Sequence, residues 1–156
     1  MDGLMDTCDA IFSHRDRETR LKILSDTHSG SFAVMGCVII LMSKTLLFSE
    51  LANPQKIFIV PVYSRLGMAI LLNNLPFAKS DGLAVTLGKL RRRSDNFYLL
   101  VFMLILGLVN VKIALIMMIC AACWGIICVK IFGGITGDLL GAFVEISEAV
   151  MLAGSL

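Results

Sequence analysis

The sequence predicts an all-α protein, a polytopic bundle of about five transmembrane helices that forms a single integral-membrane domain over residues 1–156. Of the 156 residues, 57% are hydrophobic and 17% are charged, and the mean hydropathy is +0.84. Soluble domains are about 45–50% apolar and about 25% charged, so this composition excludes an ordinary soluble protein, and it excludes a disordered one as well. The net charge of +2 is too small to indicate binding to nucleic acid. The partner that the composition does predict is the lipid bilayer.

The first two spans follow a polar segment. Residues 1–31 are polar and carry acidic motifs, whereas residues 32–156 hold the predicted spans. Phe32–Leu51 is mostly apolar and long enough to cross a hydrocarbon core of about 30 Å. Asn53-Pro54 ends this helix, and Ile57–Leu75 follows as the second span.

The apolar stretch Phe97–Phe132 is too long for one crossing. As a single helix it would measure about 54 Å, well beyond the hydrocarbon thickness. A hairpin that turns near Asn110-Val111-Lys112 therefore gives two spans, of which the first is short. Gly133-Gly134 ends the second arm, and Asp138–Leu156 forms the last span.

Basic residues indicate the orientation of the bundle. They gather in residues 14–22 and 79–93, where the second segment includes Arg91-Arg92-Arg93, and Lys130 falls on the same predicted side. Cytoplasmic loops carry an excess of Lys and Arg, so we expect this side to face the cytoplasm.

Three aspartates near the start of the chain form a candidate metal site. Asp2, Asp6 and Asp9 have the spacing i, i+4, i+7, which places them within about 60° on one helical face. Carboxylates this close repel one another unless a cation or shared protons neutralise them. Hard oxygen ligands suit magnesium, manganese or calcium. The alternative is an acidic helical turn that faces water.

A second acidic group lies in the last span. Asp138, Glu145 and Glu148 share one broad helical face, and the two glutamates lie inside a segment otherwise suited to lipid. Ionisable groups at such depth are costly and usually face a partner in the bundle interior. Lys44 and Arg65, each in its own span, supply the complementary charge. Asp138 is also able to cap a helix N-terminus.

A structural alternative exists for the two basic residues. Lys44 could extend along its helix toward the membrane surface, and Arg65 could pair with Glu50. In that case neither cation would take part in a site.

Glycines recur every fourth residue at Gly133, Gly137 and Gly141. Such spacing is typical of a face through which helices pack closely. A glycine-rich helix start also presents backbone N–H groups suited to phosphate oxygens. Both interpretations can hold together.

Other kinds of site receive little support. Cys120-Ala-Ala-Cys123 has redox spacing but lacks a second pair or a nearby histidine, so the five cysteines are interpreted as small apolar residues. His14 and His28 lack metal spacing, and His28 is expected in a solvated loop. No nucleotide-binding glycine pattern or nucleophile elbow is present in the sequence.

The acids, the intramembrane cations and the glycine-rich helix start together favour a metal-bound, phosphorylated substrate and a transfer reaction.

The motifs themselves resemble one family. Asp2-Gly3-Leu4-Met5-Asp6-Thr7-Cys8-Asp9-Ala10 resembles the DGLxDTxDG motif of the cobalamin synthase (adenosylcobinamide-GDP ribazoletransferase) family. The stretch 26–32 is similar to that family's following D-x-x-x-G-[ST] stretch, and Ser64-Arg65 with Gly82-Leu83 to its middle section. The stretch 133–148 is similar to its GGxTGDxLGAxxExxE pattern.

The resemblance implies a multi-pass enzyme of the prokaryotic inner membrane whose active site faces the cytoplasm. It would use Mg²⁺ to join adenosylcobinamide-GDP to α-ribazole or α-ribazole 5′-phosphate, and it would release GMP. The implied metal ligands are Asp2, Asp6, Asp9 and Asp26. The implied catalytic residues are Asp6 and Asp9, and the implied substrate-binding residues are Lys44, Arg65, Asp138 and Glu145. Self-association into a homo-oligomer is left open.

The chain departs from the family pattern in two places. Ala10 stands where the family has glycine, and the chain starts inside the first motif, so we expect further hydrophobic sequence to precede it in a complete member. Two other classes are alternatives. A CDP-alcohol phosphotransferase would carry Ala-Arg where Met5-Asp6 stands, and a cation transporter would place its acids at mid-membrane.

Overall fold

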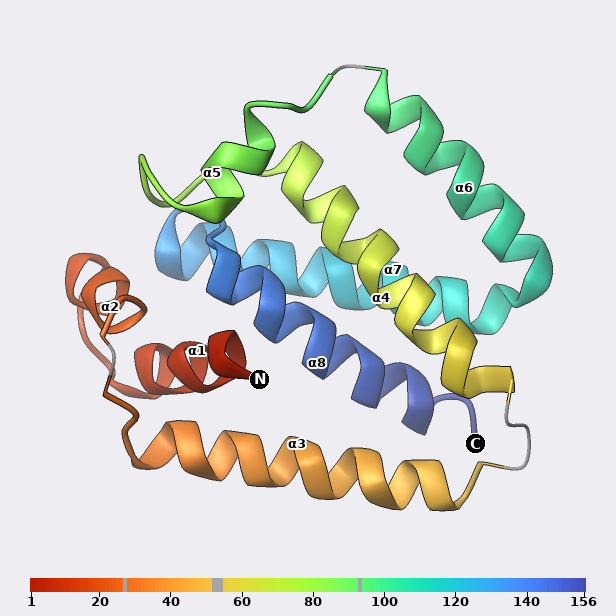
Figure 1. Ribbon diagram of the computed structural model, residues 1–156, viewed down its shortest axis with the longest axis horizontal. Coiled ribbons are helices and arrows are strands. Elements are labelled where there is room, and N and C mark those ends of the chain that lie inside the picture. The colour runs from red at the N-terminus through yellow and green to blue at the C-terminus, as the bar shows by residue number, and fades with distance from the viewer. Residues whose placement is uncertain (27, 52–54, 93) are drawn as a thin grey trace.

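The computed structural model is a helical bundle (Figure 1), in which residues 1–156 are described except for 27, 52–54 and 93. The helices are α1 (Asp2–Phe12), α2 (Arg17–Ile23), α3 (Ser31–Ser49), α4 (Gln55–Asn74), α5 (Leu83–Gly88), α6 (Asp95–Val109), α7 (Val111–Ile127), the π-helical turn η1 (Cys128–Phe132) and α8 (Gly137–Ala153). The only β-type pairing among the described residues is one isolated bridge between Phe77 and Ile135. The all-α prediction is confirmed.

All five predicted apolar helices form near their predicted positions, as α3, α4, α6, α7 and α8. Within the described residues, three helices are long and apolar enough to cross a membrane: α3, α4 and the continuous helix Val111–Phe132. α6 has 15 residues and α8 has 17, so both are shorter than a typical crossing. The predicted hairpin is confirmed, because Asn110 separates α6 from α7 and its Oδ1 accepts the N–H of Ile113. The predicted break at Asn53-Pro54 lies outside the described residues.

The two basic segments lie at the same end of the bundle. Figure 1 shows α2 and α5 at the end where α3 and α8 begin and α4 finishes. The α6–α7 turn and the C-terminus lie at the opposite end. The prediction that the basic segments lie on one side is confirmed, while Arg93 lies outside the described residues. That this side faces the cytoplasm stays a prediction.

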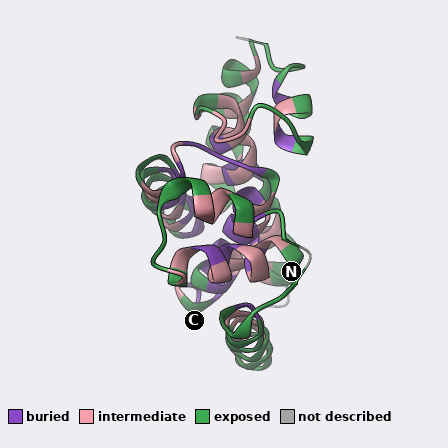
Figure 2. Cartoon of the chain, turned by 90° about the vertical axis from the view of Figure 1, so that its left-hand side faces the viewer, coloured by how far each residue is buried: buried purple, intermediate pink, exposed green. Residues whose placement is uncertain are grey.

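α8 is the central helix of the bundle. Nine of its residues are buried, whereas α3 buries only Ala33 and α6 buries none. Figure 2 shows α3 as a largely exposed helix beside the more buried part of the bundle. Side chains from α7 and α4 tie the helices together: the Trp124 indole donates to the Leu139 carbonyl at 2.9 Å, and the Tyr63 hydroxyl donates to the Leu106 carbonyl at 2.5 Å. The apolar outer faces of α3 and α6 fit a lipid environment.

Two glycines allow α1 to pack closely against α8. A Cβ atom on Gly3 would lie 2.7 Å from the Asp138 carbonyl oxygen and 2.8 Å from its Cα, and Gly141 faces the Gly3 Cα at 4.0 Å from its own Cβ position. A Cβ on Gly137 would meet nothing within 4 Å. Of the predicted packing glycines, Gly141 therefore faces Gly3 of α1, whereas Gly137 has no close neighbour.

We expect Gly3→Ala to lower the free energy of unfolding by about 2 kcal/mol, because backbone atoms of α8 cannot move aside as a flexible side chain would. Unfolding in mixed micelles, followed by circular dichroism, measures the effect. Gly107→Ala is the matched control, since a Cβ there meets no atom within 4 Å. Equal stability of the two variants would contradict the close approach.

Candidate active site

Five aspartates gather where α1, α8 and the segment after α2 meet, and we call them the acidic cluster: Asp2, Asp6, Asp9, Asp26 and Asp138. Asp6 lies at its centre on α1, outside the membrane-spanning helices. Burial raises the pKa of Asp6 to about 6, and repulsion from nearby carboxylates adds to the effect. Those neighbours are, in decreasing order of effect, Asp2, Asp138, Asp9 and Asp26. The fold thus brings the predicted metal ligands into one electrostatic neighbourhood and adds Asp138 to them.

The chemistry of the acidic cluster fits a hard divalent cation. All its donors are carboxylate oxygens, and their mutual repulsion is what a cation would relieve. In the part of the chain that is described, however, no three His, Cys, Asp or Glu side chains are close enough to share one ion as they stand. The metal site remains a prediction supported by charge rather than by coordination geometry.

Asp9 has a structural task that the sequence analysis missed. Its Oδ2 accepts the N–H of Gly30 at 2.6 Å, and its Oδ1 accepts the N–H of Ala33 at 2.8 Å. These groups belong to the first turn of α3, where backbone donors lack helical partners. Asp9 therefore caps α3 from α1 and holds the two helices together.

Asp9→Ala is expected to lower the free energy of unfolding by about 1–2 kcal/mol through loss of this cap. Faster amide hydrogen exchange confined to the first turn of α3 would locate the effect. Glu18→Ala on α2 serves as the exposed control. Unchanged exchange in the Asp9 variant would show that the cap does not stabilise α3.

Asp26 lies at the exposed rim of the acidic cluster. Its Oδ1 accepts the main-chain N–H of His28 at 3.0 Å and lies 2.9 Å from the Nδ1 of that ring. The His28 side chain is 91% exposed, so its predicted place in a solvated loop is confirmed. Asp2 and Asp26 are thus the exposed members of the predicted metal ligands, whereas Asp6 and Asp9 are half-buried.

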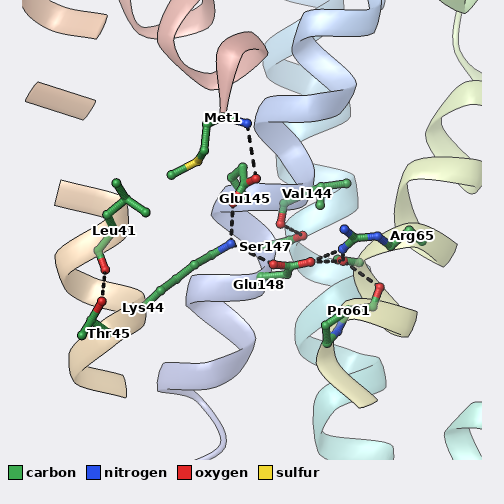
Figure 3. A network of polar contacts seen from close by, with 11 residues as sticks. Met1, Leu41, Lys44, Thr45, Pro61, Arg65, Val144, Glu145, Ser147 and Glu148 are labelled. Carbon is green, nitrogen blue, oxygen red and sulfur yellow. Dashed lines mark hydrogen bonds and ion pairs between the residues drawn. The ribbon is translucent and has the colours of Figure 1, made fainter. Parts of the chain in front are cut away.

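A partly buried ion network joins α3, α4 and α8 (Figure 3), and it consists of Lys44, Arg65, Glu145 and Glu148. Lys44 Nζ lies 2.5 Å from Glu145 Oε2 and 2.8 Å from Glu148 Oε2. The Arg65 guanidinium pairs with Glu148 Oε1. The predicted pairing of the intramembrane cations with the α8 glutamates is confirmed.

The same contacts decide against the structural alternative. Arg65 pairs with Glu148, and no ion pair with Glu50 occurs among the described residues. The Lys44 side chain is 12% exposed and points into the bundle rather than along its helix to the surface. Glu145 lies two helical turns, about 10 Å, beyond Asp138 along α8.

The glycine-rich segment before α8 is occupied by chain packing. Gly133 and Gly134 have φ values of 76° and 154°, which favour glycine. A Cβ on Gly134 would lie 2.5 Å from the Pro76 carbonyl oxygen. This close approach allows the Ile135 N–H to donate to Pro76 at 2.8 Å. The predicted phosphate role of this segment therefore rests on fewer free N–H groups than its sequence suggests.

A recess of about 300 Å³ opens beside the acidic cluster. One wall is the loop and helix start at 79–85, and the other is residues 135–138. Lys79 and Asp138 line it from opposite walls, and Lys79 Nζ also donates to the Ser25 hydroxyl. This is a concave, partly polar place, lined by Lys79, Asp81 and Asp138 among apolar residues, where a phosphorylated group can approach the aspartates.

Comparison with known proteins decides the family. The family model described as cobalamin-5-phosphate synthase matches residues 1–156. The chain belongs to this family. No solved structure matches it.

Curated relatives carry the name adenosylcobinamide-GDP ribazoletransferase. The protein of Alkaliphilus oremlandii (strain OhILAs) is 32% identical over 97% of this chain and 64% of its own length. That of Shigella flexneri is 31% identical over 100% of this chain and 68% of its own length. That of Geobacillus kaustophilus (strain HTA426) is 34% identical over 96% of this chain and 63% of its own length. The chain thus spans about two thirds of the length of these relatives.

Membership in the cobalamin-5-phosphate synthase family confirms the resemblance carried by the motifs. It also decides against the CDP-alcohol phosphotransferase and transporter alternatives. Sequence reasoning missed Lys79, whose only signal was the basic charge of its loop, and the anchoring task of Asp9, which no local pattern reveals. Metal, catalytic and substrate-binding assignments within this family member stay predictions.

Proposed function

We propose that this chain contributes the adenosylcobinamide-GDP ribazoletransferase activity, with the acidic cluster as its active site at the cytoplasmic face of a prokaryotic inner membrane. The substrates are adenosylcobinamide-GDP and α-ribazole or α-ribazole 5′-phosphate. The observation that carries the proposal is the crowding of carboxylates around Asp6 in a member of this family. Such crowding is typical of sites that bind a cation together with a phosphorylated substrate.

The reaction requires one proton acceptor from the protein. A hydroxyl oxygen of the ribazole attacks the phosphorus that carries adenosylcobinamide, and the bond from that phosphorus to the GMP oxygen breaks. The electron pair leaves with GMP, and the hydroxyl proton passes to a carboxylate. Asp6 is the proposed acceptor, because it lies at the centre of the acidic cluster. Without a bound cation its pKa of about 6 makes it a stronger base than an ordinary aspartate while it is still mostly ionised at neutral pH.

Mg²⁺ is the proposed cofactor, and Asp2, Asp6 and Asp26 are the residues that would hold it. Asp9 is a weaker candidate, because both its oxygens already accept N–H groups of α3. When bound, the ion would neutralise charge on the pyrophosphate of the substrate. A carboxylate that binds through one oxygen keeps the other to accept a proton.

Charged residues around the acidic cluster would position the substrate. Arg65 is the accessible member of the ion network, with 56% of its side chain exposed, and Asp138 lines the recess. Lys79, across the recess from Asp138, supplies positive charge for a phosphate. Lys44 and Glu145 already neutralise each other, so their part in binding would be to hold α3 and α8 in place.

Membranes that contain the chain, incubated with adenosylcobinamide-GDP, α-ribazole and Mg²⁺, test the proposal by mass spectrometry of cobalamin and GMP. The Asp6→Asn variant is the matched control, and the Shigella flexneri relative verifies the assay. Product from the chain and not from its variant is the expected result. Folded chain that makes no product while the relative does would overturn the proposal that these residues suffice for transfer.

A further inference from the structure

A second cavity lies away from the acidic cluster, between α4 and α6. Figure 1 shows α6 running alongside α4. The space between them has a volume of about 730 Å³, and its walls are mostly apolar. Leu72 contributes from α4, whereas Leu99, Phe102 and Ile105 contribute from α6. We call this space the α4–α6 groove.

The α4–α6 groove has a polar mouth. A smaller cavity of about 260 Å³ is lined by Asn73, Arg91, Arg92 and Asn96. Asn73 and Arg91 also line the apolar groove, so the two spaces adjoin. One end of the combined cavity is therefore basic and polar, and the rest is apolar.

The basic charge at the mouth exceeds the acidic charge. Arg91 Nη1 donates to the Asn73 carbonyl at 3.2 Å, and its guanidinium lies 5.6 Å from the centre of the Phe77 ring. Asp95 lines the groove as well, and its Oδ2 accepts the main-chain N–H of Arg92 at 2.7 Å. In the described part of the chain, neither guanidinium forms an ion pair, so two cations face one carboxylate.

We propose that the α4–α6 groove binds an anionic phospholipid, with an acyl chain along Leu72 and Phe102 and the headgroup phosphate at Arg91 and Arg92. Basic pockets between transmembrane helices on the cytoplasmic side are typical sites for anionic headgroups. A soluble phosphorylated molecule would leave the apolar walls uncovered, and a zwitterionic lipid would leave the excess positive charge unmatched. The proposal is independent of the transferase activity, because it uses none of the acidic cluster.

Native mass spectrometry of the purified chain in mild detergent measures binding directly. The probes are phosphatidylglycerol and phosphatidylcholine with the same acyl chains, and inorganic phosphate as competitor. We expect phosphatidylglycerol to bind about tenfold more tightly than phosphatidylcholine. Equal binding of the two lipids, or displacement of phosphatidylglycerol by millimolar phosphate, would overturn the proposal.

Two variants separate the headgroup contact from the groove itself. Arg92→Gln should reduce the preference for phosphatidylglycerol about fivefold, whereas Arg15→Gln, an exposed change at the link between α1 and α2, should leave it unchanged. Ile105→Trp should fill the groove and weaken both lipids, and Val101→Trp repeats the test if that variant does not fold. An unchanged preference in the Arg92 variant, or unchanged binding when the groove is filled, would show that lipid binds elsewhere.

Discussion

Asp6→Asn is expected to lower ribazole transfer by about 100-fold or more while it stabilises the metal-free protein at neutral pH. Asparagine cannot accept the proton of the attacking hydroxyl, which accounts for the loss of activity. The gain in stability comes from the pKa of Asp6, which burial and neighbouring carboxylates raise to about 6 in the folded protein. The unfolded chain has an ordinary aspartate with a pKa near 3.8.

The sign of the pH dependence follows from proton binding. Between pH 4 and pH 6 the folded protein binds more protons at Asp6 than the unfolded chain does, so its stability falls as the pH rises through this window. Asparagine at this position does not ionise, so the variant does not lose stability as the pH rises. The variant should therefore gain about 1 kcal/mol above pH 6, a figure reduced for solvent screening, and nothing below about pH 4.

Thermal unfolding at pH 4 and pH 8, with and without Mg²⁺, measures the effect. If the acidic cluster holds the ion, Mg²⁺ should raise the Tm of the native chain at pH 8, and it should raise the Tm of the Asp6 variant less. Chelation should reverse the rise. Native transfer activity in the Asp6→Asn variant would exclude Asp6 as the base. A Tm at pH 8 equal to that of the native chain would show that the ionised Asp6 does not destabilise the fold.

Lys44→Met is expected to lower the free energy of unfolding by about 3 kcal/mol. The lysine pairs with Glu145 and Glu148, and the side chains of these three residues are only 12–21% exposed. Glu148 keeps the hydroxyl of Ser64 and the Arg65 guanidinium after the change. Among the described residues, Glu145 keeps no side-chain cation after the change, so a carboxylate is left poorly compensated inside the bundle.

Unfolding in mixed micelles compares this variant with Lys22→Met, an exposed change on α2 that should have little effect. The double variant Lys44→Met with Glu145→Gln should recover part of the loss, because it removes the unpaired charge along with its partner. Steady-state kinetics add an independent readout. A raised KM for adenosylcobinamide-GDP with native kcat would assign Lys44 to substrate binding rather than to packing alone.

Local patterns in the sequence determined the helices of this protein. Runs of apolar residues predicted the helices of the bundle, and the breaks at Asn110 and at Gly133-Gly134 occur where expected. Such features depend on hydrophobic burial and on hydrogen bonds between residues close in the chain. The spacing of Asp2, Asp6 and Asp9 on α1 likewise follows from helical geometry alone.

Packing between distant helices decided how the charged residues work together. The sequence indicated complementary charges in separate spans, but only the fold pairs Arg65 with Glu148 and directs both oxygens of Asp9 to α3. Only the fold brings Asp138 to Asp6, through the close contact of Gly3 with α8. The physical reason is that the position and pKa of a charged group depend on which other groups surround it in space, and helix packing selects those neighbours.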